Sequence, residues 1–119
     1  NDAYERLTAA TDARGRKLEV HRIHQPGPIY ITEEEARDVD AVAGTLPRNT
    51  GDRLAGSYIN YYACNGGVIV PVFGDAHDAA ALPSLQGLYP ERKVTPVPAR
   101  EILLGGGNIH CITQQQPAG

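Results

Sequence analysis

Apolar and polar positions near the amino end of the chain predict a short helix followed by a strand. Within residues 2–11, apolar side chains recur at every third position between charged ones: Tyr4, Leu7 and Ala10. This spacing puts them on one face of a helix, for which Asn1 or Asp2 could serve as N-cap. Gly15 ends the helical pattern, and residues 17–24 alternate imperfectly between apolar and polar positions, which indicates a strand.

The next segment predicts a short extended piece and then a polar surface loop. Residues 29–31 are Ile-Tyr-Ile, and residues 32–52 are rich in Glu, Asp, Arg and Gly. Thr32 and Glu35 have the spacing of a capping box, which predicts a brief helix over residues 33–39. We expect the rest of the segment 32–52 to be loop.

A β-hairpin is the clearest local prediction in the chain. Residues 58–64 are β-prone, and residues 68–72 form the apolar run typical of a buried strand. Between them, Asn65-Gly66-Gly67 has the composition of a tight hairpin turn. The two strands should therefore pair directly with each other.

A helix and further strands should follow the hairpin. Residues 77–88 favour a helix that Asp75 could cap, and Pro83 would delay the start of this helix or kink it. The remaining elements are a strand, a short turn of helix or loop, and a final strand: residues 93–97, 100–104 and 108–115. This order is a ββαβ unit preceded by the end of another such unit, so the predicted fold class is α/β.

Composition and charge indicate the class of protein and its location, and they argue against one kind of partner. The chain has 119 residues, of which 41% are hydrophobic and 21% charged, as in one soluble domain. A net charge of −3 without any Lys/Arg cluster argues against nucleic acid as a partner. No apolar run approaches the roughly 20 residues needed to cross a bilayer, and no signal peptide is evident, so we expect a cytoplasmic protein. The chain lacks methionine and begins at Asn1, which suggests a piece of a longer protein.

The two cysteines lead to different expectations. Cys64 and Cys111 are too far apart in sequence to suggest a zinc site or a disulfide framework, so no metal or cofactor is expected. Cys64 is expected to be a small buried side chain. Cys111 follows three glycines, residues 105–107, which let a backbone turn sharply or approach a ligand closely. This setting favours a reactive thiolate.

Four segments together resemble the agmatine deiminase family. They are Ser57 to Tyr62, Asn65-Gly66-Gly67-Val68, Phe73-Gly74-Asp75 and, above all, Gly105-Gly106-Gly107-Asn108-Ile109-His110-Cys111-Ile112-Thr113-Gln114-Gln115. The resemblance spans nearly the whole chain and is weakest in residues 32–52. It implies the pentein fold, an α/β propeller of about five ββαβ-type blades. Residues 1–119 would then be the C-terminal portion of one pentein domain, a partial propeller of about two blades.

The resemblance implies a chemistry for Cys111. In this family a cysteine attacks the guanidinium carbon of agmatine, ammonia leaves, and water hydrolyses the amidino-cysteine intermediate to release N-carbamoylputrescine, which leads to putrescine. Cys111 would be this nucleophile. Gly107 and Asn108 would shape the wall beside the thiol, and Asp75 would be a substrate-binding carboxylate or merely a helix cap. No cofactor is implied.

The resemblance also shows what the chain lacks. The family's catalytic histidine belongs to a His-x-Asp arrangement upstream, and no such arrangement occurs here. His110 is adjacent to Cys111, but neighbouring residues of a strand point to opposite faces, so we expect His110 to pack elsewhere. The acid/base and the guanidinium-binding carboxylates should therefore lie outside these 119 residues.

Other functions remain open on the sequence. The substrate could be arginine or peptidyl-arginine, since related penteins share the thiol mechanism. A non-catalytic interaction module derived from a pentein is a third reading. Strands at the edge of a partial propeller would be unpaired, so we expect a homo-oligomer or association with the missing N-terminal part.

Overall fold

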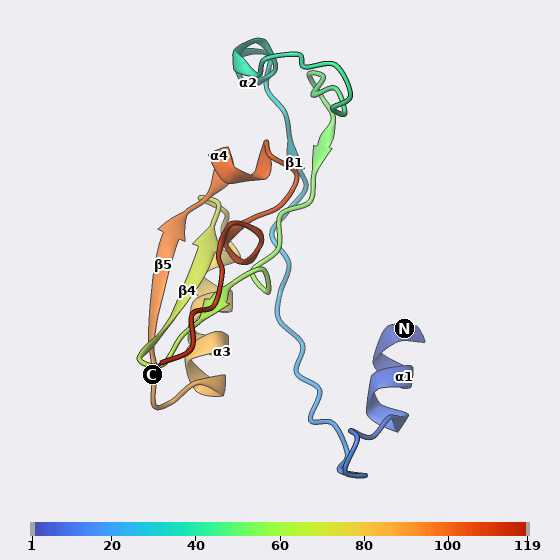
Figure 1. Cartoon of the computed structure of the whole chain (residues 1–119), viewed down its shortest axis with the longest axis vertical. Helices are drawn as coiled ribbons and strands as arrows, with labels where there is room; N and C mark the ends of the chain where they lie inside the picture. Colours follow the sequence, from blue (N-terminus) through green and yellow to red (C-terminus); the bar gives the residue numbers. More distant parts are fainter. Residues whose placement is uncertain (1, 119) are drawn as a thin grey trace.

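The computed structural model describes residues 2–118 and has three parts (Figure 1). The central part is a three-stranded sheet with one long helix. A two-stranded protrusion carries a short helix at one end of the molecule, and an extended arm ends in the N-terminal helix, which stands apart from the sheet. None of the helices within residues 2–118 combines the length and the apolar character needed to cross a membrane.

The central sheet confirms the predicted hairpin and adds a parallel strand. Strand β3 (Tyr62–Ala63) pairs antiparallel with β4 (Gly67–Val72), and β4 pairs in parallel with β5 (Lys93–Pro98). Helix α3 (Asp78–Leu88) connects β4 to β5 and continues through Pro83. The predicted strand over residues 58–64 is confirmed only at its end, because the residues before β3 form a turn.

Apolar side chains from the sheet and α3 make the main core. The fully buried members are Tyr58, Val68, Val70, Ala81 and Leu85. Burial of the Tyr58 ring leaves its hydroxyl in need of a partner, and it donates to Oδ1 of Asp78 at 2.7 Å. Asp78 is the first residue of α3 and the helix is preceded by His77, so the expectation that Asp75 caps this helix is wrong.

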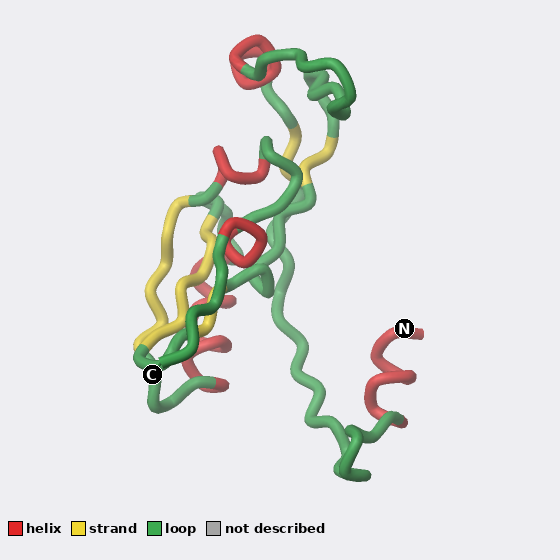
Figure 2. The backbone as a smooth tube through the Cα atoms, in the orientation of Figure 1, coloured by secondary structure: helices red, strands yellow, loops and turns green. Residues whose placement is uncertain are grey.

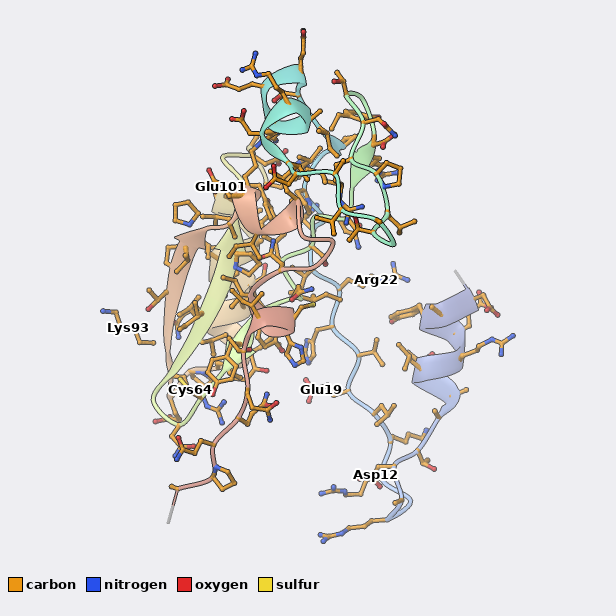
Figure 3. The ribbon with its side chains drawn as sticks, turned by 45° about the horizontal axis from the view of Figure 1, so that its top comes forward. Asp12, Glu19, Arg22, Cys64, Lys93 and Glu101 are labelled. Carbon is orange, nitrogen blue, oxygen red and sulfur yellow. The ribbon has the colours of Figure 1, made fainter. Side chains whose placement is uncertain are left out.

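The amino-terminal part is partly as predicted. Helix α1 (Asp2–Ala9) forms as the spacing indicates, with no buried residue. The strand predicted over residues 17–24 does not form, and this stretch runs as an extended arm without a ladder (Figure 2). An alternating sequence becomes a strand only when a neighbouring segment pairs with it through hydrogen bonds. In the described part of the chain, residues 17–24 have no such ladder, and their pairing is limited to an isolated bridge between Lys17 and Thr11. Arg22 of the arm is labelled in Figure 3, and its guanidinium carbon lies 3.9 Å from the centre of the Tyr4 ring of α1.

The protrusion contains the predicted capping box and a strand pair. Strand β1 (Ile29–Tyr30) pairs antiparallel with β2 (Arg53–Leu54), which the sequence did not reveal. Helix α2 (Glu33–Asp38) begins after Thr32, whose hydroxyl accepts the N–H of Glu35 while the Glu35 carboxylate accepts the N–H of Thr32. Irregular chain connects α2 to β2.

An ion pair and a small core attach the protrusion to α4 (Arg100–Leu103). Arg100 Nε donates to Glu35 Oε1 at 2.6 Å, and its Nη2 donates to the carbonyl of Tyr30 at 2.8 Å. Beside this pair lies a buried apolar cluster from both parts: Ile29, Ile31, Leu54 and Leu103. The protrusion is thus fixed to the segment that leads into the glycine turn.

The ion pair predicts an acid-sensitive attachment. The Arg100 guanidinium, followed by the Thr32 N–H, lowers the pKa of Glu35 from 4.5 to about 2. A carboxyl whose pKa is lower in the folded state stabilises that state above its unfolded pKa, and this stabilisation is lost as pH falls from about 5 towards 2. Arg100→Gln should therefore flatten the pH dependence of unfolding in this window, as measured by urea denaturation of the full-length protein.

The matched control is Arg37→Gln. Arg37 pairs with Asp38 at 3.7 Å with both side chains about 70% exposed, so its loss should leave the pH dependence unchanged. A wild-type slope retained in Arg100→Gln would contradict this account of the attachment.

Candidate active site around Cys111

The segment that carries Cys111 is a turn of 3-10 helix, so the predicted final strand over residues 108–115 is wrong. Residues Ile109–Ile112 form this helix, η1, and residues 113–118 belong to no helix or strand. The helical turn forms because the backbone carbonyl oxygen of Asn108 accepts the N–H of Cys111 at 2.9 Å. Asn side chains and carbonyls that bond their own neighbours compete with strand ladders.

Asn108 also ties η1 to the sheet. Its side chain is 1% exposed, its Oδ1 accepts the N–H of Ile109 at 2.8 Å, and its Nδ2 donates to the carbonyl of Ala99 at 3.2 Å. Ala99 follows directly after β5. Both polar ends of the Asn108 side chain are thus engaged by protein, and its predicted role at the substrate stays a prediction.

The glycine turn is shaped by close approach at two positions. Gly106 has a φ of +92°, which only glycine adopts without strain. Its N–H donates to the backbone carbonyl of Leu103, and this hydrogen bond closes the turn. A Cβ placed on Gly107 would lie 2.8 Å from both Cβ and Sγ of Cys111. Gly107 therefore lies directly against the thiol side chain, as part of the wall beside it.

Arg48 connects the protrusion to this turn. Its Nε donates to the carbonyl of Leu104 at 2.7 Å, and its Nη2 is 2.9 Å from where a Cβ on Gly106 would stand. The turn before Cys111 is thereby held by the irregular loop of the protrusion as well as by α4.

Asn60 is the polar neighbour of the thiol that the sequence did not identify. Its Nδ2 donates to Sγ of Cys111 at 3.3 Å, and its Oδ1 accepts the N–H of His110 at 2.9 Å. Asn60 lies in the turn before β3, in a run that looked like strand. The sequence did contain one indication that Asn60 does not belong to a strand. Asn is depleted in strands, and here it interrupts a β-prone run.

Hydrogen bonding lowers the pKa of the Cys111 thiol. The Asn60 side chain is the main cause and the Asn108 backbone the next. The thiol is also exposed, so a reagent or substrate can reach it. Lowered pKa with access is the setting of a reactive cysteine rather than a structural one.

His110 is exposed, and among residues 2–118 its ring makes no hydrogen bond. His110 and Cys111 lie in η1 and not in a strand, so the alternation of strand faces does not separate their side chains. In a 3-10 helix successive side chains lie about a third of a turn apart, so His110 and Cys111 still point in different directions.

Asp75 forms its hydrogen bonds with other parts of the chain. Its Oδ1 accepts the backbone N–H of His77 at 2.8 Å and lies 2.6 Å from Nδ1 of the same residue, while its Oδ2 accepts the N–H of Gly27 at 3.0 Å. The backbone N–H of His77 is the main cause of its lowered pKa. In the described part of the chain no hydrogen bond joins Asp75 to Gly107, Asn108 or Cys111, and its role at the substrate stays a prediction.

No group of three or more His, Cys, Asp or Glu side chains suited to a metal ion occurs among residues 2–118. The contacts of Cys111 define an exposed, hydrogen-bonded thiol on a short helical turn. Such a thiol can serve as a nucleophile toward an electrophilic carbon.

Comparison with known proteins places the chain in a deiminase family. A sequence model of the Porphyromonas-type peptidyl-arginine deiminases matches residues 1–117, and the chain belongs to this family. Agmatine deiminase of Pseudomonas aeruginosa is 58% identical over 112 residues, which cover 94% of this chain and 30% of that protein. A Listeria monocytogenes relative is 65% identical over 116 residues, which cover 98% of this chain and 32% of the relative.

Solved structures agree in fold. Agmatine deiminase of Enterococcus faecalis superposes with a TM-score of 0.89 at 46% identity, covering 98% of this chain and 32% of that one. A cysteine-to-serine variant of C. jejuni agmatine deiminase with substrate bound gives a TM-score of 0.54 at 27% identity, covering 72% and 20%. The predicted α/β class is confirmed, and the chain spans about a third of the length of the curated relatives it matches.

The contact of Gly107 with the thiol gives a direct test. Gly107→Ala adds a methyl group 2.8 Å from Sγ and so must displace the Cys111 side chain. Since a misplacement of about 1 Å can cost about 100-fold in rate, we expect the rate of Cys111 alkylation to change by at least about tenfold.

Gly66→Ala is the matched control, because a Cβ there meets nothing within 4 Å. It should leave the reactivity of Cys111 unchanged. Equal reactivity of Gly107→Ala and the wild type would mean that Gly107 does not set the position of the thiol.

Proposed function

We propose that the full-length protein containing this chain is an agmatine deiminase. It converts agmatine and water to N-carbamoylputrescine and ammonia, with Cys111 as the nucleophile. The observation that carries this proposal is the exposed thiol whose pKa is lowered by Asn60, in a chain whose close relatives are named agmatine deiminases.

The chemistry proceeds in two displacements. The Cys111 thiolate adds to the guanidinium carbon of agmatine, and the tetrahedral adduct expels ammonia after proton transfer to the departing nitrogen. The resulting S-alkylthiouronium adds water at the same carbon, loses the protons of that water and expels the thiolate, which leaves the urea carbonyl of N-carbamoylputrescine. Covalent catalysis thereby divides one difficult substitution into two easier ones.

The chain supplies the nucleophile and part of its surroundings. Gly107 and Asn108 form the wall beside the thiol and Asp75 contributes to substrate binding, while the histidine acid/base and the carboxylates that grip the guanidinium come from the rest of the protein. In this proposal the chain forms about two blades of a pentein propeller of about five. The remaining blades cover its open strand edges, and the intact protein is expected to associate with further copies.

The proposed product leads to putrescine, so the protein would act in putrescine biosynthesis, in the cytoplasm. Peptidyl-arginine is the second candidate substrate, because the family whose model matches is described by that activity. A module without catalytic activity is the remaining alternative, and it predicts a thiol with an ordinary pKa.

Turnover by the full-length protein tests the proposal. Agmatine, arginine and an arginyl peptide are supplied separately, and ammonia and the urea product are measured. We expect agmatine to be the best substrate by kcat/KM and Cys111→Ser to abolish turnover. Cys64→Ser is the control, because Cys64 is half-buried in the hairpin, where its thiol lies 3.4 Å from the carbonyl of Gly67.

A higher kcat/KM for the arginyl peptide than for agmatine would identify peptidyl-arginine as the substrate in place of agmatine. Unchanged activity in Cys111→Ser would exclude Cys111 as the nucleophile. Absence of turnover with all three substrates would favour the non-catalytic module. The isolated 119-residue chain is expected to be inactive, because the acid/base is expected to lie elsewhere.

A further inference from the structure

Two prolines lie in β5, the strand at one side of the central sheet (Figure 1). Within residues 2–118 its only ladder partner is β4, so its other edge carries no second strand. Pro96 and Pro98 have no backbone N–H, and neither can donate to a neighbouring strand. The effect on association depends on which side of β5 the two missing N–H groups would face.

The two prolines occupy positions that face away from β4. The N–H of Lys93 donates to the carbonyl of Gly66 at 3.2 Å, just before β4 begins. The N–H of Ala99, directly after β5, donates to the carbonyl of Val72 at 3.0 Å, where β4 ends. Because the backbone N–H groups of a strand alternate between its two sides, positions 94, 96 and 98 of β5 point outward.

The remaining outward N–H, that of Val94, is already bonded. It donates to Oε1 of Gln86 in α3 at 3.2 Å. The Nε2 of Gln86 donates to the carbonyls of Tyr89 and Arg92, at 3.0 and 2.9 Å, which holds this side chain in place. Along the described length of β5, the outer edge therefore presents carbonyl oxygens and no free N–H.

We propose that the outer edge of β5 is closed to strand addition, so that neither a second copy of this chain nor another segment of the full-length protein extends the central sheet there. An added strand would donate N–H groups to β5 but would find no N–H for its own carbonyl oxygens. Those carbonyls would lose their hydrogen bonds to water without replacement, which is unfavourable. Prolines and lysines protect exposed edges in other proteins, and Lys93 is exposed at the start of β5.

The opposite side of the sheet differs from the β5 edge. Cys64 and Gly67 exchange backbone hydrogen bonds at 2.9 and 3.4 Å, so the N–H of Ala63, one residue earlier, points away from β4. Among residues 2–118 this N–H has no acceptor. The open edges left for the rest of the protein or for a further copy are those of β3 and of the protrusion. This inference does not depend on the proposed deiminase activity.

The test opens the edge in the full-length protein with the double variant Pro96→Val/Pro98→Val. Both prolines are exposed and valine favours strands, so the change restores two outward N–H groups without disturbing the core. Molar mass is measured by light scattering during size-exclusion chromatography at increasing protein concentration. We expect the mass to rise at least about twofold over the wild type, because two opened edges can pair with each other.

Pro90→Val is the matched control. It makes the same substitution at an exposed proline in the turn before β5, outside the strand. Its mass should equal that of the wild type at every concentration. An equal rise of mass in Pro90→Val would overturn the proposal, because association would then follow from the loss of a proline and not from the opening of the edge.

Hydrogen exchange of the new amides at positions 96 and 98 gives a second measurement on the double variant. They should exchange rapidly in dilute protein and slowly once the mass has risen. A folded double variant that keeps the wild-type mass would overturn the proposal. Slow exchange of both amides before any association would also overturn it, because another segment would already lie along the edge. If the double variant does not fold, Pro96→Val alone decides by the same two measurements.

Discussion

The buried side chain of Asn108 is the contact on which the candidate site depends. Asn108 favours a helical turn over the strand that the surrounding residues predict, because its Oδ1 and its backbone carbonyl accept the N–H groups of Ile109 and Cys111. Its Nδ2 donates to the carbonyl directly after β5. A buried amide stripped of these partners would cost about 1–3 kcal/mol for each unmet group. The short helical turn with Cys111 follows from satisfying them.

Segments distant in sequence converge on this turn. Asn60 holds it from the hairpin side, Gly107 allows the thiol to lie against the backbone, and Arg48 holds the preceding carbonyl from the protrusion. The protrusion itself is fixed by Arg100 and a small apolar cluster. The position of the thiol is therefore set by the folded chain rather than by the glycine turn alone.

Local sequence signals predicted the elements whose causes are local. The capping box at Thr32, the Asn-Gly-Gly turn and the helix after Asp75 depend on neighbouring residues, and each formed. The strand predicted over residues 17–24 is absent because a strand needs a second segment with which to pair. The strand predicted over residues 108–115 is absent because the hydrogen bonds of Asn108 favour a helical turn there.

The residues of the candidate site also differ in how far the sequence predicts them. Cys111 and Gly107 stood out through spacing and composition, whereas Asn60 meets the thiol across 51 positions, which no local pattern encodes. The ion pair between Glu35 and Arg100 is likewise a contact of the folded state, 65 positions apart. Long-range polar contacts of this kind depend on the packing of the whole fold and leave only weak traces in sequence.

The central claim is that Cys111 forms a covalent bond to the substrate carbon. The most direct measurement is acid quenching of the full-length protein during turnover of agmatine, followed by mass spectrometry of the peptide that contains Cys111. The account predicts that this peptide gains the mass of agmatine less ammonia, and that the gain is absent from Cys111→Ser. Turnover of agmatine with an unmodified Cys111 peptide, or the same mass gain on another residue, would contradict it.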